Sequence, residues 1–281
     1  MSLLTQDRAA PSAFRRGRRP GELTPGAGLG LGVGVLWLSL LVLLPVAAIV
    51  SSAFEDGFAG FWAAVTDAEA LAAIRFTVGA SLLVTAVNAV VGTLIAWVLV
   101  RDRFPGKRVL EVVIDIPFAL PTIVAGLVLI TLYGPTSPFG VNLVGTRAGV
   151  VLALLFVTLP FVVRSVQPVL IDADREVEQA AASLGASGYT IFRRVILPTV
   201  LPAVVSGSAL SFARALGEFG SVILISANLI GKTQVSSSYI LKMIESQDEV
   251  AAASVATLLL VVAVVVTVVL DVVQRKAARR G

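Results

Sequence analysis

The sequence predicts an all-α polytopic membrane protein with six transmembrane helices. Its 281 residues are 57% hydrophobic and only 14% charged, with a mean hydropathy of +0.92, whereas soluble domains are about 45–50% apolar and about 25% charged. Six apolar runs are long enough to cross a bilayer, and the basic residues collect in every second gap between them. Together these observations define the fold class.

Each predicted helix rests on length, because a hydrocarbon core about 30 Å thick requires about 20 apolar residues per helix. The runs cover residues 29–53, 76–100, 112–133, 148–170, 200–227 and 251–273. Residues 28–54 are thus expected to hold the first helix, and residues 74–273 a domain of five helices. Two prolines lie within the third run, and an arginine and a glutamate interrupt the fifth.

Both ends of the chain are basic. Residues 1–27, rich in Arg, Pro and Gly, are expected to form a flexible cytoplasmic tail, and residues 274–281 a short second tail. A cleaved signal peptide is the alternative at the N-terminus, because a basic segment precedes an apolar run. That run is longer than the roughly 7–15 apolar residues of a signal peptide, which favours a retained helix.

Lysine and arginine predict the orientation, since short cytoplasmic loops carry an excess of both. Most of the 22 basic residues lie in the two tails, after the second run, and at or after the end of the fourth. These are Arg8, Arg15, Arg16, Arg18, Arg19, Arg101, Arg103, Lys107, Arg108, Arg164, Arg175, Arg193, Arg194, Arg275, Lys276, Arg279 and Arg280. We therefore expect both termini and residues 171–198 in the cytoplasm.

Cysteine and histidine are both absent from the chain. This excludes disulfides, zinc-finger sites, Cys or His nucleophiles and His-ligated metals, and we expect no catalytic residue, metal or cofactor. The pI near 9.8 could suggest nucleic acid. The basic residues flank apolar runs, however, where topology and anionic lipid headgroups account for them, so nucleic-acid binding is not expected.

The sequence SANLIGKT, residues 226–233, ends like a phosphate-binding loop. It lacks the first glycine of GxxxxGK[ST], no strand precedes it, and the charge pattern places it outside the cell. We interpret Lys232 as an ordinary loop lysine, and the chain is not expected to hydrolyse ATP by itself.

Arg214 and Glu218 lie four residues apart in the fifth run, on one face of the predicted helix. A helix entering from the cytoplasm near Pro202 would carry Arg214 about 18 Å deep. Ionisable groups at such depth face a cavity or a partner. The arginine could meet an anionic substrate, or the two residues could form an ion pair that holds this helix against its neighbours.

The third run contains IPFALPTIVAG, in which Pro117 and Pro121 interrupt the backbone hydrogen bonds of a helix. Broken helices often line a permeation route, because their unpaired backbone groups need protein or water around them. A packing kink relieved by Thr122 is the alternative. With Arg214 and Glu218, these three residues are the candidates for a translocation path.

Residues 177–198, VEQAAASLGASGYTIFRRVILP, are the polar exception in this apolar chain. A short helix is predicted up to Leu184, ended or sharply turned by Gly185, and a second short helix is predicted over residues 189–196, stopped by Pro198. The small residues at its centre would let another protein approach the backbone closely. Such a surface suits docking better than catalysis.

This segment resembles the cytoplasmic loop of importer-type ABC permeases, whose signature is E-A-A, three residues, G, nine residues, then I-x-L-P. The matching positions are Gln179, Ala180, Ala181, Gly185, Val195, Leu197 and Pro198. Val195 replaces isoleucine, a trivial change. Gln179 replaces the usual glutamate, and Glu178 stands just before it, so either residue could make the contact with the ATPase.

Further stretches are similar to the permeases of sulfate and thiosulfate importers, over roughly residues 28–273. They are LYGP (132–135), FVVRSVQPVL (161–170), SFARALGEFGSVILIS (211–226), KTQVSSSYI (232–240) and KMIES (242–246). Molybdate permeases share the ARALGEFG part, which leaves a molybdate or tungstate permease as the alternative. The last two stretches lean toward sulfate.

The resemblance implies a type I importer (MetI-like) membrane domain in the bacterial cytoplasmic membrane. Residues 171–198 would be the loop that couples it to ATP hydrolysis, through Glu178, Gln179, Ala180, Ala181, Gly185, Leu197 and Pro198. Implied partners are two cytoplasmic ABC ATPase subunits, a second homologous permease expected to be a paralogue, and an extracytoplasmic sulfate/thiosulfate-binding protein. A rival of another class, a membrane enzyme using Glu218 and Asp115 as acid and base, is disfavoured because these carboxylates lie on different spans.

Overall fold

The computed structural model describes residues 25–278. Within this range every regular element is a helix. The described residues divide into two units, the first ending at Ala48 and the second beginning at Ile49. Residues 1–24 of the expected N-terminal tail, and residues 279–281 of the expected C-terminal tail, lie outside the described range.

The first predicted span is helical throughout. α1 (Pro25–Leu38), the π-helical turn η1 (Ser39–Leu43) and α2 (Leu44–Ala53) follow one another directly, and Leu29–Ala53 is an apolar span of 25 residues. The wider π turn lies just before Pro45, whose ring would collide with the carbonyl group four residues earlier in a regular helix. Leu29, Trp37 and Leu41 are all more than half exposed, as expected for a helix surrounded by lipid.

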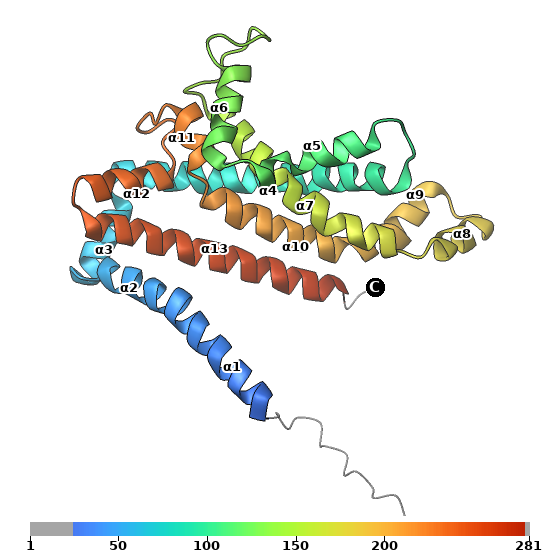
Figure 1. The fold of residues 1–281 in the computed structure, drawn as a ribbon, viewed down its shortest axis with the longest axis horizontal. Helices are drawn as coiled ribbons and strands as arrows, with labels where there is room; N and C mark the ends of the chain where they lie inside the picture. Colours follow the sequence, from blue (N-terminus) through green and yellow to red (C-terminus); the bar gives the residue numbers. More distant parts are fainter. Residues whose placement is uncertain (1–24, 279–281) are drawn as a thin grey trace, which may run out of the picture. The chain divides into compact units, whose positions relative to one another are not determined.

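Four long helices pack side by side in the second unit (Figure 1). They are α4 (Ala68–Arg101), α7 (Arg147–Asp172), α10 (Leu197–Leu216) and α13 (Glu249–Ala278). α10 contacts the other three, and α7 packs against both α4 and α10. The helices α4, α7 and α13 confirm the second, fourth and sixth predicted spans.

Small and polar residues hold this bundle together. The Asn88 Nδ2 on α4 donates to the Thr158 Oγ1 on α7 at 2.8 Å and to the Ser211 Oγ on α10 at 3.3 Å. A Cβ atom added to Gly207 of α10 would lie 2.9 Å from the Val162 Cα and the Ser165 Cβ of α7. Close backbone approach and interhelical hydrogen bonds are the means by which helices associate in lipid.

The third predicted span is a broken pair of helices. α5 (Lys107–Ala119) and α6 (Thr122–Tyr133) are bent by 119° at the break, so the described residues contain five apolar spans, or six if this pair counts as one. Leu120 is extended, at φ −86° and ψ 135°, because the residue before Pro121 is sterically excluded from the helical region. Pro117 is accommodated inside α5.

The fifth predicted span is wrong as a single helix over residues 200–227. α10 ends at Leu216, the chain breaks at residues 217–219, and α11 (Gly220–Ser226) is a separate short helix. The Glu218 Oε1 accepts hydrogen bonds from the Ser221 N–H and the Ser221 hydroxyl, both at 2.9 Å. A carboxylate that caps a new helix start in this way favours a break over a continuous helix.

Two further helices, α3 (Gly57–Thr66) and α12 (Ser236–Glu245), lie in predicted loops. α12 is tied to the start of α4, because the Lys242 Nζ lies 2.7 Å from a Glu69 carboxylate oxygen and the Gln234 Nε2 donates to Glu69 at 2.9 Å. Burial and the carboxylates of Asp67, Glu69 and Asp248 raise the pKa of Tyr239 above its usual value of 10. Its hydroxyl therefore stays protonated at neutral pH.

The α7–α10 contact predicts a specific packing effect. Gly207→Ala should destabilise the bundle by about 1–3 kcal/mol, because the added methyl group would meet the backbone of α7. The thermal midpoint in detergent should fall by about 2–4 °C per kcal/mol. Gly79→Ala is the matched control, since nothing lies within 4 Å of its added Cβ. Equal midpoints for the two variants would contradict this packing.

Candidate functional site

The predicted docking segment begins with α8 (Arg175–Ser183), which ends in a left-handed glycine turn. The Asp174 Oδ1 caps the start of the helix by accepting from the Glu176 N–H at 2.8 Å. At its end, the Gly185 N–H donates to the Ala182 carbonyl at 2.9 Å and the Ala186 N–H donates to the Ala181 carbonyl at 3.1 Å. This is the Schellman arrangement. Gly185 has φ +85°, where a residue with a side chain is strained, so the predicted turn is confirmed.

The second short helix is not stopped by Pro198, contrary to the sequence prediction. α9 (Gly188–Ile191), the π-helical turn η2 (Phe192–Ile196) and α10 run on as one helix from Gly188 to Leu216. As before Pro45, a π turn just before the proline removes the collision that a regular helix would suffer. The docking segment is therefore joined to α10 by continuous helix.

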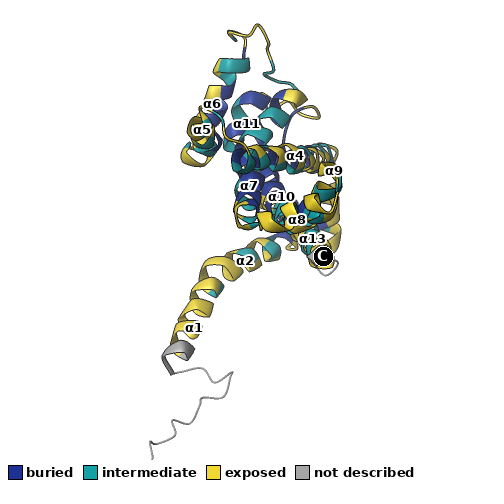
Figure 2. Ribbon diagram, turned by 90° about the vertical axis from the view of Figure 1, so that its right-hand side faces the viewer, coloured by how far each residue is buried: buried dark blue, intermediate teal, exposed yellow. Residues whose placement is uncertain are grey.

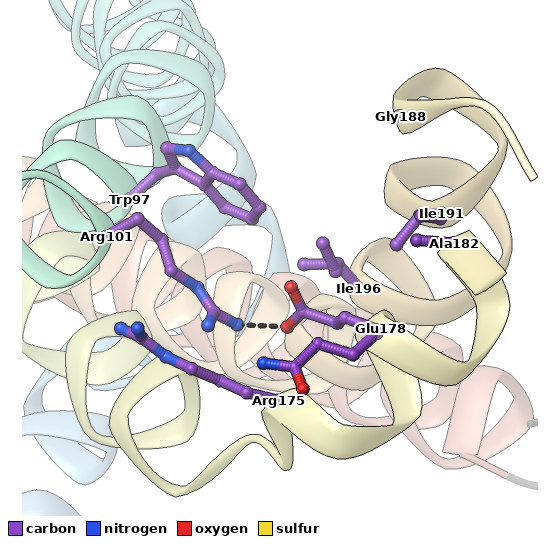
Figure 3. Close-up of a pocket in the computed structure, with 9 residues that line it drawn as sticks. Trp97, Arg101, Arg175, Glu178, Ala182, Gly188, Ile191 and Ile196 are labelled. Carbon is purple, nitrogen blue, oxygen red and sulfur yellow. Dashed lines mark hydrogen bonds and ion pairs between the residues drawn. The ribbon is translucent and has the colours of Figure 1, made fainter.

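The two faces of α8 differ. The inner face lines a pocket of about 430 Å³ whose other walls come from α4 and from the α9–η2 helix (Figure 3). The pocket residues are Trp97, Arg101, Arg175, Glu178, Gln179, Ala182, Gly188, Ile191 and Ile196. On the outer side, Val177, Ala180 and Leu184 are exposed, and Leu184 is 90% exposed. Figure 2 shows α8 as largely exposed.

An ion pair joins this inner face to the end of α4. The Arg101 guanidinium binds the Glu178 carboxylate, and only 10% of the Arg101 side chain and 21% of the Glu178 side chain are exposed. The Arg101 guanidinium carbon also lies 5.5 Å from the centre of the Trp97 ring, a cation–π distance. The Trp97 ring in turn meets Phe192 of η2 edge-on, with centroids 5.8 Å apart.

The other motif residues are mostly exposed. Gln179 and Ala180 are exposed and Ala181 is half-buried, all on α8, while Leu197 and Pro198 lie at the start of α10. Of the two residues considered for an ATPase contact, Glu178 is thus paired within the chain and Gln179 is not buried.

The candidate path residues meet at the break between α10 and α11. The Arg214 Nη1 lies 2.5 Å from the Glu218 Oε2, and 34% of the Arg214 side chain is exposed against 1% for Glu218. The guanidinium and the carboxylate attract each other as opposite charges, but the Glu218 Oε2 accepts no hydrogen bond. The Ser237 hydroxyl also donates to the Glu218 carbonyl at 2.8 Å. The side chain and the carbonyl group of Glu218 are therefore both occupied by contacts at the break, whereas the Arg214 side chain is partly exposed.

The two broken spans adjoin one another. α6 packs on α11, and a Cβ added to Gly220 would lie 2.1 Å from the Thr122 Oγ1, while one added to Gly126 would lie 2.8 Å from the Ser221 carbonyl oxygen. Thr122 and Pro121 are thus brought beside the Glu218 break. Pro117 lies about one helical turn earlier, inside α5.

Asp115 has a different partner from any that the sequence suggested. The Arg164 Nε on α7 donates to the Asp115 Oδ1 at 2.8 Å, a second Arg164 nitrogen binds the other carboxylate oxygen, and the Arg164 Nη1 donates to Gln167 at 2.7 Å. This fork joins α5 to α7. Asp115 and Glu218 are each held in separate ion pairs, which gives no support to an acid–base pair.

Residues 226–233 form a turn whose threonine is used internally. The Thr233 hydroxyl donates to the Ser226 carbonyl at 2.5 Å, and the Arg147 Nε donates to the Lys232 carbonyl at 3.0 Å. In a phosphate-binding loop the threonine hydroxyl would serve the metal of the nucleotide. Within residues 25–278, moreover, no three Asp or Glu residues group closely enough to hold a metal ion.

The second unit is thus a helical bundle with broken spans, and the α8 loop projects from one end of it (Figure 1). Residues 88–280 match the family described as the binding-protein-dependent transport system inner membrane component. The chain belongs to this family, and it is a multi-pass inner-membrane transport subunit.

The names of individual relatives are more specific than the family description. The chain is 41% identical over 252 residues to the sulfate transport system permease protein CysT of Synechocystis, which covers 87% of this chain and 88% of that protein. It is 38% identical over 263 residues to the protein of the same name from Escherichia coli, with coverage of 91% and 95%.

Solved structures share the fold at low identity. A bacterial ABC transporter involved in the import of the acidic polysaccharide alginate matches with a TM-score of 0.73 and 16% identity, over 89% of this chain and 94% of that one. The MetNI methionine ABC transporter matches with a TM-score of 0.56 and 17% identity, over 73% and 94%. The MetI-like fold prediction is thus confirmed.

Proposed function

We propose that this chain is the permease subunit of an ABC importer that moves sulfate or thiosulfate across the bacterial cytoplasmic membrane. The observation that carries the proposal is the projecting α8 loop, which ends in a left-handed Gly185 turn and is followed by a continuous helix from Gly188 to the end of α10. A loop with this exposed apolar strip is suited to receive force from another protein. The names of the relatives support sulfate as the substrate class.

The proposal requires partners. ATP hydrolysis belongs to two separate cytoplasmic subunits that dock on residues 171–198, since the one nucleotide-like motif of this chain is an internally bonded turn. The family description supports an extracytoplasmic binding protein, for which we propose sulfate or thiosulfate as ligand. A second, homologous permease would complete the path across the bilayer.

The proposed orientation places both termini and α8 in the cytoplasm. The basic residues Arg101, Arg103, Lys107 and Arg108 support this, because they lie at the same end of the bundle as the loop that contains Glu178. The basic tails, residues 1–27 and 274–281, would then face anionic headgroups of the inner leaflet.

We place the translocation path along the two adjacent breaks, near Arg214, Glu218, Pro117, Pro121 and Thr122. Discontinuous helices leave backbone groups free, which membrane proteins tolerate beside a substrate route. Arg214 keeps donors beyond the one that faces Glu218. Because Glu218 offsets its charge, Arg214 would attract an oxyanion only weakly, so that the ion can leave again.

Uptake of labelled sulfate tests the substrate class. In cells that lack their own sulfate importer and carry this chain with its partner subunits, uptake should appear and excess thiosulfate should compete with it. Excess molybdate should compete poorly. Strong competition by molybdate, or labelled molybdate uptake without sulfate uptake, would instead indicate the molybdate or tungstate alternative.

Gly185→Asp tests the docking loop. Sulfate uptake should fall about tenfold or more, because aspartate at φ +85° strains the turn and adds a charge beside the docking strip. The amount of chain in the membrane should not change. Gly106→Asp is the matched control, since Gly106 has φ +86° and is equally open. Normal uptake by Gly185→Asp would contradict the docking role.

Charge exchange tests the path. Arg214→Ala should lower sulfate uptake, and the double variant Arg214→Glu with Glu218→Arg should not restore it, because the cation is moved into the buried position that caps α11. If the exchange restores full uptake, the pair is structural and Arg214 does not contact the substrate.

A further inference from the structure

The pocket beneath α8 holds a nearly buried ion pair that the transport motif does not explain. Glu178 comes just before the motif, and Arg101 ends α4, 77 residues earlier in the chain. Figure 3 shows the two side chains reaching toward each other across the pocket, with Trp97 beside Arg101. With so little of either side chain exposed, water screens their attraction less than at an open surface.

Arg101 contacts its own helix and α8, and a third element packs on its aromatic partner. Its own helix supplies Trp97, α8 supplies the Glu178 carboxylate, and η2 supplies Phe192 behind the Trp97 ring. An arginine side chain that is fixed in this way has lost most of its rotamer freedom, so it is not available to a partner on the water-facing side. The pair therefore links α8 to α4 independently of the covalent connection of α8 to α7 and α10.

The ion pair also determines which side chains of α8 are available to bind a partner protein. The carboxylate of Glu178 is neutralised on the inner face. Val177, Ala180 and Leu184 lie three and four residues apart, and all are exposed and uncharged, although Val177 also borders a second pocket with Ile196. The exposed carboxylate of Glu176 lies four residues before Ala180, at the edge of this strip. Tyr189 of α9, 71% exposed, adds an aromatic ring. Gln179 lines the inner pocket but remains exposed, and it offers an amide where the family usually has a carboxylate.

We propose that the Arg101–Glu178 pair is an internal positioning link, so that α8 presents an apolar strip and the Gln179 amide, but not the Glu178 carboxylate, to the ATPase. This inference rests on the proposed function. The partner chemistry follows: a cleft with an apolar floor for Leu184 and Tyr189, and a neutral hydrogen-bonding group, rather than a required cation, opposite Gln179. Movement of the docked α8 would reach α4 through the pair, and α10 through the Gly185 turn and the helix that begins at Gly188.

Charge exchange in the assembled complex tests this link. Arg101→Gln and Glu178→Gln should each reduce sulfate uptake by about tenfold relative to ATP hydrolysis, because either variant breaks the same contact. The double variant Arg101→Glu with Glu178→Arg should recover most of the uptake. Arg108→Gln is the control, as it removes an exposed charge from the same end of the bundle. All variants should retain the ATPase on purification.

If Glu178 instead contacts the ATPase directly, the same variants should behave differently. Arg101→Gln would then leave transport intact, while Glu178→Gln and the exchanged double variant would lose the ATPase on purification. Either of these results would overturn the positioning role.

A distance measurement tests the positioning link in a way that does not depend on which substrate is transported. The chain has no cysteine, so spin labels at Arg103→Cys and Ser183→Cys would be the only ones it carries. In the complex reconstituted in bilayer discs, the label-to-label distances should form one narrow distribution, broaden in Arg101→Gln and Glu178→Gln, and narrow again in the exchanged variant. Identical distributions in all four would overturn the link, whereas failure of sulfate uptake alone would overturn only the proposed substrate.

Discussion

A charged side chain in an apolar surrounding must be neutralised within the protein, because moving it out of water unpaired is very costly. In this chain three arginines that face the bundle each meet a carboxylate: Arg101 with Glu178, Arg164 with Asp115, and Arg214 with Glu218. The first two pairs join separate helices, and the third spans a helix break. The ion pairs therefore fix α8 on α4, α5 on α7, and the break between α10 and α11.

The helix from Gly188 to Leu216 connects two of these pairs. Its 29 residues extend about 1.5 Å each, from the pocket under α8 to the break that holds Glu218. The π turn before Pro198 keeps it continuous, so a displacement that reaches α9 meets no break in the helix before Leu216. In the proposed function, this helix carries the motion of the ATPase toward the candidate path.

Sequence reasoning predicted the features that depend on local pattern. Apolar length gave the membrane spans, and small residues followed by Gly185 gave the helix and turn of the docking segment. It missed α3 and α12, since ten-residue helices are too short for a search based on membrane-spanning length. It also missed the break after Leu216, which depends on the capping of Ser221 by a glutamate that the apolar pattern treats as an interruption.

The partners of Arg101 and Arg164 could not be predicted for a different reason. Arg101 and Arg164 were counted as basic residues that orient the helices, and their partners lie 77 and 49 residues away in sequence. No local spacing links such residues; only the packing of α4, α5, α7 and α8 does. The inward position of Glu178, which bears on the choice between it and Gln179, became visible only through Arg101.

The outer face of α8 is the proposed surface on which the ATPase docks. Because the chain lacks cysteine, Leu184→Cys can be labelled alone with a membrane-impermeant maleimide from the cytoplasmic side. The account predicts rapid labelling in the permease by itself and strong protection once the ATPase subunits bind, while Arg103→Cys labels equally in both states. Equal labelling of Leu184→Cys with and without the ATPase would contradict it.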